Sequence, residues 1–72
     1  KNVGIVRFNA FDDVGGEQSF SVVMLDSDRN GVAVSSIYGR QESRVYAKAI
    51  SKDQGERPLS DEEQKALELA LS

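Results

Sequence analysis

The sequence lacks two residue types, cysteine for covalent cross-links and histidine for catalysis and metal binding. Its 72 residues contain no cysteine and no histidine. Without cysteine there are neither disulfides nor thiolate metal sites, and the sequence does not indicate whether the protein works in an oxidising or a reducing compartment. Without histidine the chain lacks the commonest general base and the commonest zinc ligand. A hydrophobic core must therefore supply the stability, in a chain near the lower size limit for folding unaided.

Long apolar runs and an excess of basic charge are missing too. No run approaches the ~20 residues that span a bilayer, so a signal or anchor would have to lie outside these residues. The net charge is -3, divided as -2 over residues 1–34 (three basic, five acidic), +2 over 35–58 (five basic, three acidic) and -3 over 59–72 (one basic, four acidic). A nucleic-acid partner is not expected from this balance, because such proteins are basic or carry a dense basic face.

The patterns that are present predict an α+β fold, with a four-stranded antiparallel sheet followed by one C-terminal amphipathic helix. Runs of β-branched and aromatic residues predict strands over residues 3–8, 18–25, 32–38 and 44–50. Short connections between consecutive strands favour antiparallel hairpins. We interpret residues 1–72 as a single small domain excised from a longer chain, since it starts at Lys1 without methionine and enters a strand almost at once.

The helix is predicted over residues 61–71. Ser60 and Glu63 have the spacing of a capping box, and acidic residues fill the first turn. Apolar residues recur with helical spacing at Leu59, Ala66, Leu67, Ala70 and Leu71.

The strands carry apolar residues on both faces. In the second strand Phe20, Val22 and Met24 alternate with Val23 and Leu25. One helix of about three turns cannot cover both faces of a four-stranded sheet. The second face is expected to be covered by a second copy, by another segment of the parent chain or by a partner.

The stretch D-S-D-R-N-G from Asp26 to Gly31 opens like a calcium-binding EF-hand loop. The twelfth loop position, where a bidentate glutamate is needed, is Ile37, and the flanking runs have strand rather than helix character. Asn30-Gly31 between two such runs is a strong hairpin signal. The sequence therefore predicts a turn here, and no metal site or cofactor is expected.

The succession of blocks along the chain resembles a family. V-G-I-V-R-F-N-A-F-D-D-V-G-G-E-Q-S-F-S, N-G-V, S-S-I-Y-G-R-Q-E-S-R-V-Y-A-K and P-L-S-D-E-E follow one another as in the bacterial domain of unknown function 4446, over residues 3–68. The resemblance implies a small parent protein with an N-terminal membrane anchor and a helical, coiled-coil segment ahead of this C-terminal domain. It implies no activity, substrate or cofactor. Bacterial membrane association through the parent chain is expected, on a side that the sequence does not determine.

Two clusters are candidate binding sites. In the block around the fourth strand, Arg44, Tyr46 and Lys48 alternate onto one face with Arg40 in the adjoining turn, and these groups could grip a carboxylate or phosphate. The alternative is a solvated face with ion pairs to acidic neighbours such as Glu42. The second cluster is a loop of paired carboxylates and a glycine pair, which could hold a cation or receive a basic partner, or could simply be a capped turn. Its residues of interest are Asp12, Asp13, Gly15 and Gly16.

Catalysis has little support in the sequence. A serine–lysine dyad with Lys48 is formally possible, but nothing places a serine on a strained elbow or beside an oxyanion hole. The available serines are Ser19, Ser21, Ser35, Ser36 and Ser43. We therefore do not expect an enzyme. A non-catalytic interaction or scaffold domain, self-associating or docking a protein partner in a bacterial envelope-associated protein, is the first hypothesis. An anionic-ligand or headgroup-binding module that uses the basic strand is the second.

Overall fold

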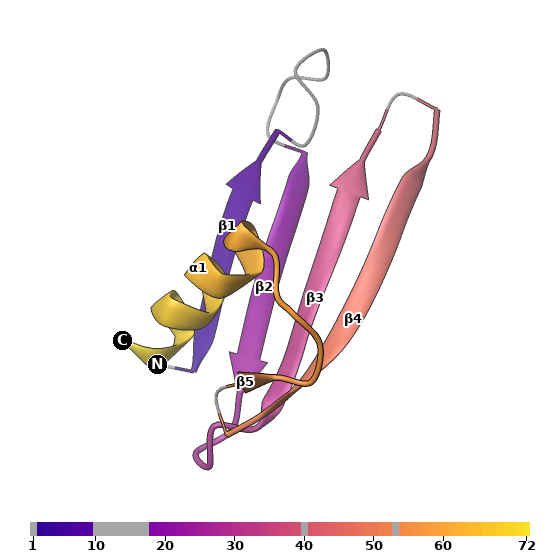
Figure 1. The fold of residues 1–72 in the computed structure, drawn as a ribbon. Helices are drawn as coiled ribbons and strands as arrows, with labels where there is room; N and C mark the ends of the chain where they lie inside the picture. The colour runs from indigo at the N-terminus through magenta and orange to yellow at the C-terminus, as the bar shows by residue number, and fades with distance from the viewer. Residues whose placement is uncertain (1, 10–17, 40, 53) are drawn as a thin grey trace.

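The computed structural model describes residues 2–9, 18–39, 41–52 and 54–72. Five strands form one antiparallel sheet in the order β1-β2-β3-β4-β5, so each strand pairs with its neighbours in sequence (Figure 1). The strands are β1 (Val3–Phe8), β2 (Ser19–Leu25), β3 (Gly31–Tyr38), β4 (Ser43–Ser51) and β5 (Gln54–Gly55), and helix α1 (Asp61–Leu71) follows them. No helix in the described ranges is long and apolar enough to cross a membrane.

The α+β class, the antiparallel sheet and the C-terminal helix are confirmed, but the prediction of four strands is wrong by one. The strand that was missed is β5, which pairs with Ile50 and Ser51 at the end of β4. It follows a tight turn in which Lys52 has a φ of 52°. Two residues, Gln54 and Gly55, carry no alternating or β-branched pattern, so periodicity cannot reveal this strand.

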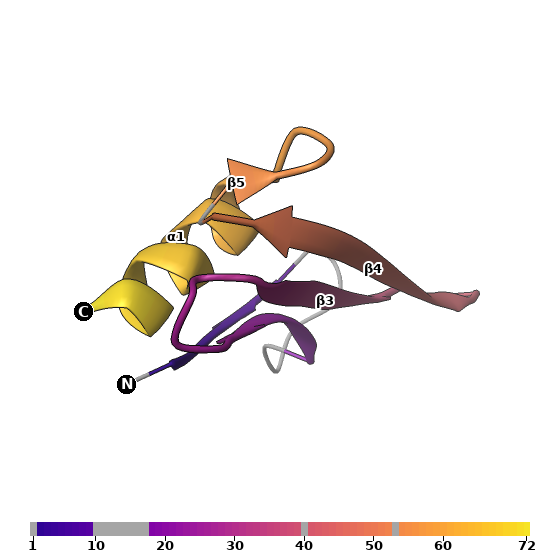
Figure 2. The ribbon, with the colours of Figure 1, turned by 90° about the horizontal axis from the view of Figure 1, so that it is seen from below.

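Helix α1 begins at the predicted capping box. The Ser60 hydroxyl accepts a hydrogen bond from the Glu63 amide at 3.1 Å, and the Glu63 carboxylate accepts one from the Ser60 amide at 2.8 Å. The helix lies over β1 and β2 on one side of the sheet (Figures 1 and 2). It approaches β1 so closely that a Cβ added at Gly4 would lie 2.0 Å from the Ala66 carbonyl oxygen. Glycine at this position therefore sets the distance between helix and sheet.

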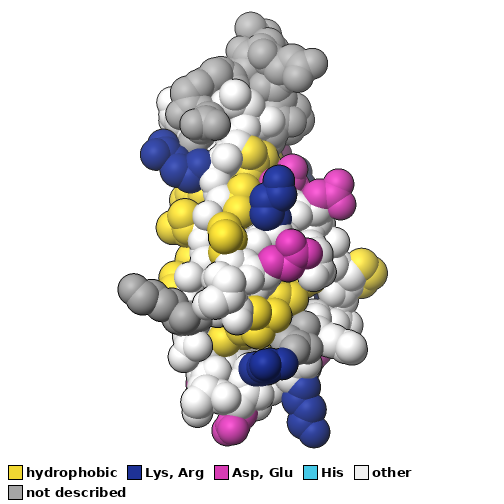
Figure 3. All heavy atoms as spheres, turned by 90° about the vertical axis from the view of Figure 1, so that its left-hand side faces the viewer, with side chains coloured by type: hydrophobic (Ala, Val, Ile, Leu, Met, Phe, Trp, Pro, Cys, Tyr) yellow, Lys and Arg dark blue, Asp and Glu magenta, His cyan; other side chains and the backbone are white. Residues whose placement is uncertain are grey.

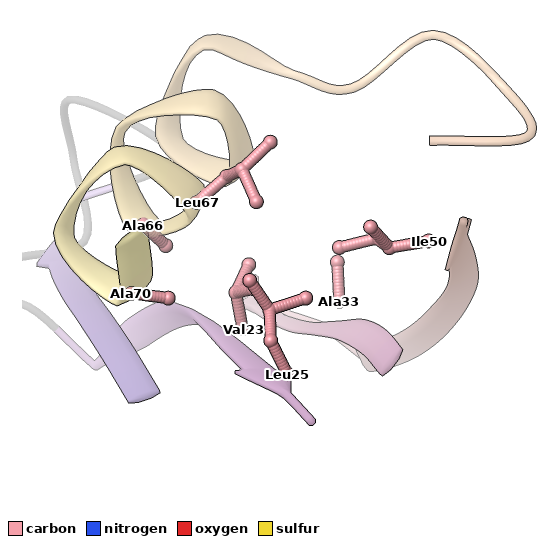
Figure 4. Close-up of a cluster of buried hydrophobic side chains, with 7 residues drawn as sticks. All are labelled: Val23, Leu25, Ala33, Ile50, Ala66, Leu67 and Ala70. Carbon is pink, nitrogen blue, oxygen red and sulfur yellow. The ribbon is translucent and has the colours of Figure 1, made fainter. Parts of the chain in front are cut away.

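The core lies between the helix and one face of the sheet. Side chains from β2, β3 and β4 point toward side chains of α1 (Figure 4). The buried apolar residues are Val23, Leu25, Ala33, Ile50, Ala66, Leu67 and Ala70, with Val6 and Leu59 packed against them. The apolar face of α1 was predicted to make this contact, and Leu67 is only 3% exposed.

The chain turns a corner between β2 and β3, as predicted for D-S-D-R-N-G, but by a different device from the expected one. The Asp26 carboxylate accepts hydrogen bonds from the amides of Asp28 and Asn30 at 2.8 and 3.0 Å. The residue with positive φ is Arg29, at 66°, rather than the Asn-Gly pair. Gly31 already belongs to β3, where an added Cβ would lie 1.9 Å from the Met24 carbonyl oxygen. Glycine is needed there because β2 and β3 approach each other too closely for a side chain.

Candidate functional site

The face of the sheet opposite α1 is a continuous apolar surface, which we call the open face. Strand residues alternate between the two faces, and the core residues define the covered one. The register then assigns the opposite residues of four strands to the open face. They are Val3, Ile5 and Arg7 of β1, Phe20, Val22 and Met24 of β2, Val32, Val34, Ser36 and Tyr38 of β3, and Ser43, Val45, Ala47 and Ala49 of β4.

Several large side chains of the open face are exposed to solvent. Val45 is 69% exposed, Val3 and Ile5 are each 57% exposed, and Met24 is 44% exposed. The space-filling view looks onto the β1 edge of the molecule, where hydrophobic side chains reach the surface at several places (Figure 3). Exposed large apolar side chains that adjoin one another on a sheet, rather than scattered singly, indicate an interaction surface.

The open face is small and almost uncharged. With about 3.3 Å per residue and about 4.8 Å between strands, its four strands give a plan area of roughly 480 Å². Arg7 is the one charged residue that the register of the described strands assigns to it. The acidic first turn of α1, with Asp61, Glu62 and Glu63, lies on the opposite side of the sheet.

On the covered face, one buried carboxylate ties three elements together. Glu63 of α1 is 2% exposed. Its Oε2 accepts a hydrogen bond from the Ser35 hydroxyl of β3 at 2.6 Å, and its Oε1 accepts one from Lys48 Nζ of β4 at 2.8 Å. The Ser21 and Ser35 hydroxyls lie 2.7 Å apart, which extends the network to β2. Together with the capping bond to Ser60, these contacts hold the helix start on the sheet.

The surroundings of Glu63 favour its ionised form. Burial alone would raise the pKa of this carboxyl group. Hydrogen bonds from Lys48, Ser35 and the Ser60 amide, together with the positive charge of Lys48, outweigh burial and lower the pKa below its ordinary value. No side-chain polar atom buried in the described residues lacks a hydrogen-bond partner. The network is therefore complete without a ligand.

The structure brings three of the four basic-block residues together on the covered face of β4. Arg44, Tyr46 and Lys48 lie opposite Ile37, Ser35 and Ala33 of β3. Lys48 Nζ also donates to the Pro58 carbonyl at 3.0 Å, in addition to its ion pair with Glu63.

Arg44 is compensated by neighbours as well. It forms an ion pair with Glu42 at 2.8 Å, and the hydrogen bonds that its guanidinium donates to Tyr46 and Glu42 raise its pKa. Arg40, the fourth member of the predicted site, lies outside the described residues.

The other predicted candidates are the loop of paired carboxylates and the five serines, of which Ser36 is partly buried and Ser43 is exposed. Asp12, Asp13, Gly15 and Gly16 lie outside the described residues. Three of the serines considered as nucleophiles are buried, and each makes a structural hydrogen bond. They are Ser19, which accepts from the Tyr38 amide, Ser21 and Ser35.

A shallow pocket of about 280 Å³ adjoins the Glu63 network. Phe8, Ile37 and Tyr46 contribute its apolar wall, and Lys48 and Glu63 contribute its polar end. Lys48 and Glu63 are already paired with each other, and Glu62 also lines the pocket. The sequence did not indicate that Glu63 is the centre of this cluster. The capping box accounts for a glutamate at this position, and it gives no sign of the contacts with β3 and β4.

Residues 1–71 match the family described as Protein of unknown function (DUF4446). The chain belongs to this family. The match confirms the resemblance noted in the sequence, and the family description assigns no activity. Neither the curated proteins nor the solved structures gave a match.

Proposed function

We propose that this DUF4446 domain is a non-catalytic protein-interaction domain that binds an apolar surface of a protein partner through its open face. The observation that carries the proposal is the continuous apolar surface opposite α1, where Val45, Ile5 and Val3 are more than half exposed. Burial of such a surface is the main favourable term in most protein association. A sheet with one covered and one bare apolar face is incomplete without an occupant.

The chemistry of the open face indicates the kind of partner. It carries Arg7 as its one charge among the described strand residues, so a partner surface rich in charge would lose hydration without compensation. It is also small, with a plan area of roughly 480 Å². A single domain is therefore suited to a weak or transient contact with an apolar surface.

The contacts on the covered face favour this function over the anionic-ligand alternative. Of the cations expected to hold an anion, the two that the structure describes are paired internally, Lys48 with Glu63 and Arg44 with Glu42. A bound anion would have to displace these partners or add to the negative charge beside them. The membrane-anchored parent protein expected from the family resemblance is part of the same proposal, since an anchor would bring the domain to an envelope partner.

A pair of matched double variants tests the function. Ile5→Lys with Met24→Lys adds two charges to the open face, and Leu69→Lys with Leu71→Lys adds the same two charges to helix positions that are 47% and 40% exposed. Both variants change the net charge equally. The proteins are expressed in the native host and recovered under identical mild conditions, and folding is verified by circular dichroism.

The open-face variant should lose the co-purifying protein by tenfold or more, and the helix variant should retain it. Retention by both variants, or loss from the helix variant alone, would contradict the assignment. Liposome sedimentation with neutral and acidic vesicles tests whether the open face binds a membrane surface instead of a protein. Vesicle binding that the open-face variant abolishes, without any protein partner, would replace the proposal.

A further inference from the structure

Strand β4 has an outer edge that β5 covers only at one end. β5 pairs with Ile50 and Ser51, and the Glu56 amide donates to the Ala49 carbonyl at 3.0 Å. Over residues 43–48, no strand in the described part of the chain lies beside this edge. An edge of this length is a template for the addition of another strand.

The backbone groups that face this edge follow from one hydrogen bond. In an antiparallel strand the N–H and C=O of a residue point to the same side, and the side alternates along the strand. The Ala49 carbonyl points outward to Glu56. The backbone N–H and C=O groups of Ala47, Val45 and Ser43 therefore point outward as well. The Glu42 carbonyl accepts from the Gly39 amide at 3.0 Å, on the β3 side, in agreement with this alternation.

We propose that two copies of the chain pair through this edge, β4 against β4 in antiparallel fashion, with Val45 opposite Val45 of the second copy on a two-fold axis. The two valines exchange both backbone hydrogen bonds. On either side, Ser43 of one copy exchanges hydrogen bonds with Ala47 of the other. Every outward N–H and C=O of these three residues then has a partner. A closed two-fold contact of this kind is self-complementary and ends at two copies.

Sterics and charge select this register. A shift by one residue toward the C-terminus would place Ser43 opposite Ala49, whose outer edge is already occupied by Glu56. It would also place Arg44 opposite Lys48, and like charges directly opposite each other are destabilising. A shift toward the N-terminus would place Arg44 opposite Arg44 and shorten the ladder.

The register centred on Val45 avoids both problems. It places Arg44 opposite Tyr46 of the second copy, which suits a guanidinium over an aromatic ring. One step further it places Glu42 opposite Lys48, a pair of opposite charge. Glu42 also keeps its 2.8 Å contact with Arg44 of its own chain, so the acid joins two cations.

The pairing joins two sheets into one and places two open faces side by side. Their combined plan area is roughly 960 Å² by the same strand spacings, twice that of one domain. The consequence for partner binding rests on the proposed function. The edge pairing does not, because it depends on the backbone of β4 alone.

A cysteine scan tests the pairing and its register, since the chain has no cysteine of its own. Ser43→Cys, Val45→Cys and Ala47→Cys are oxidised separately under mild conditions at millimolar protein concentration. In the proposed register the two copies of position 45 face each other at about 5.5 Å between Cα atoms, within disulfide range. The two copies of position 43, and likewise of 47, lie about 13 Å apart and cannot be bridged.

Val45→Cys should therefore give a covalent dimer in high yield, and the other two variants should remain monomeric on denaturing gels. Val45→Pro, which removes the central amide without breaking a bond within the monomer, should abolish the dimer seen by sedimentation equilibrium. A chain that stays monomeric at millimolar concentration, or a disulfide at 43 or 47 instead of 45, overturns the proposal. Failure here leaves partner capture through the open face untouched, whereas failure of the proposed function leaves the Val45→Cys dimer intact.

Discussion

At the residue scale, Glu63 combines three structural roles. Its carboxylate caps the helix through the Ser60 amide, accepts from Ser35 on β3 and pairs with Lys48 on β4. The capping role was predictable, because it depends on a spacing of three residues along the chain. The contacts with Ser35 and Lys48 were not predictable. They depend on how the sheet positions these two residues, which are separated from Glu63 by 28 and 15 positions in the sequence.

Replacement of this carboxylate should be costly. Glu63→Gln keeps the shape but removes the charge that binds the Lys48 ammonium, and we expect a loss of about 1.5–3 kcal/mol in the free energy of unfolding, the range for hydrogen bonds to a charged group. The matched control is Asp61→Asn, which removes an exposed charge from the same helical turn and should cost about 0.5 kcal/mol. Urea denaturation measures both. Equal losses in the two variants would mean that the buried network contributes no more than the helix dipole.

The same carboxylate predicts a dependence of stability on pH. Because the folded structure lowers the pKa of Glu63, the ionised form favours folding. The contribution is fully present above the unfolded pKa of about 4.3 and is lost as the pH falls through the lower folded value. The urea midpoint of the wild type should therefore approach that of Glu63→Gln between neutral pH and about pH 3. A gap between the two proteins that is constant over this range would refute the assignment.

At the element scale, long periodic segments were predictable and short irregular ones were not. Helix α1 was expected over 61–71 and occupies Asp61–Leu71, because a capping box and a helical apolar stripe both mark it. β5 escaped prediction because two residues cannot show a period. The Asn30-Gly31 pair indicated the right corner for the wrong reason, since Arg29 takes the positive φ and Gly31 is needed for the close approach of Met24.

The contact between α1 and the sheet can be measured through one leucine. Leu67 is 3% exposed in the core, so Leu67→Ala should cost about 2–5 kcal/mol as a cavity-forming truncation. In a domain of this size such a loss would unfold a large share of the molecules. Leu69→Ala, at a position 47% exposed on the same helix, is the control and should cost less than about 1 kcal/mol. An unchanged denaturant midpoint for Leu67→Ala would mean that α1 does not pack on the sheet in solution.

At the scale of the whole molecule, the uneven covering of the sheet is the feature that connects fold to function. The sequence predicted that one helix would leave a face bare, because Phe20, Val22 and Met24 alternate with Val23 and Leu25. The structure has α1 on the side of Val23 and Leu25, with the opposite side open. The identity of the occupant was not predictable, since a single apolar surface fits many partners equally well.

The basic block shows how far site prediction from sequence reaches. Alternation correctly placed Arg44, Tyr46 and Lys48 on one face of β4. It could not indicate that this is the face toward the helix, where Lys48 is paired with Glu63. The anion-binding hypothesis depended on free cations, and pairing is a tertiary property that strand periodicity does not contain.

Photo-crosslinking tests directly whether the open face contacts a protein. A photoreactive amino acid replaces Ile5 on the open face or, as the control, Leu71 on the helix, which are 57% and 40% exposed. Each protein is irradiated in its native host, and the products are identified by mass spectrometry. We expect a discrete covalent product with a protein from position 5 and none from position 71. Products from position 71 alone, or only lipid adducts from position 5, would contradict this expectation.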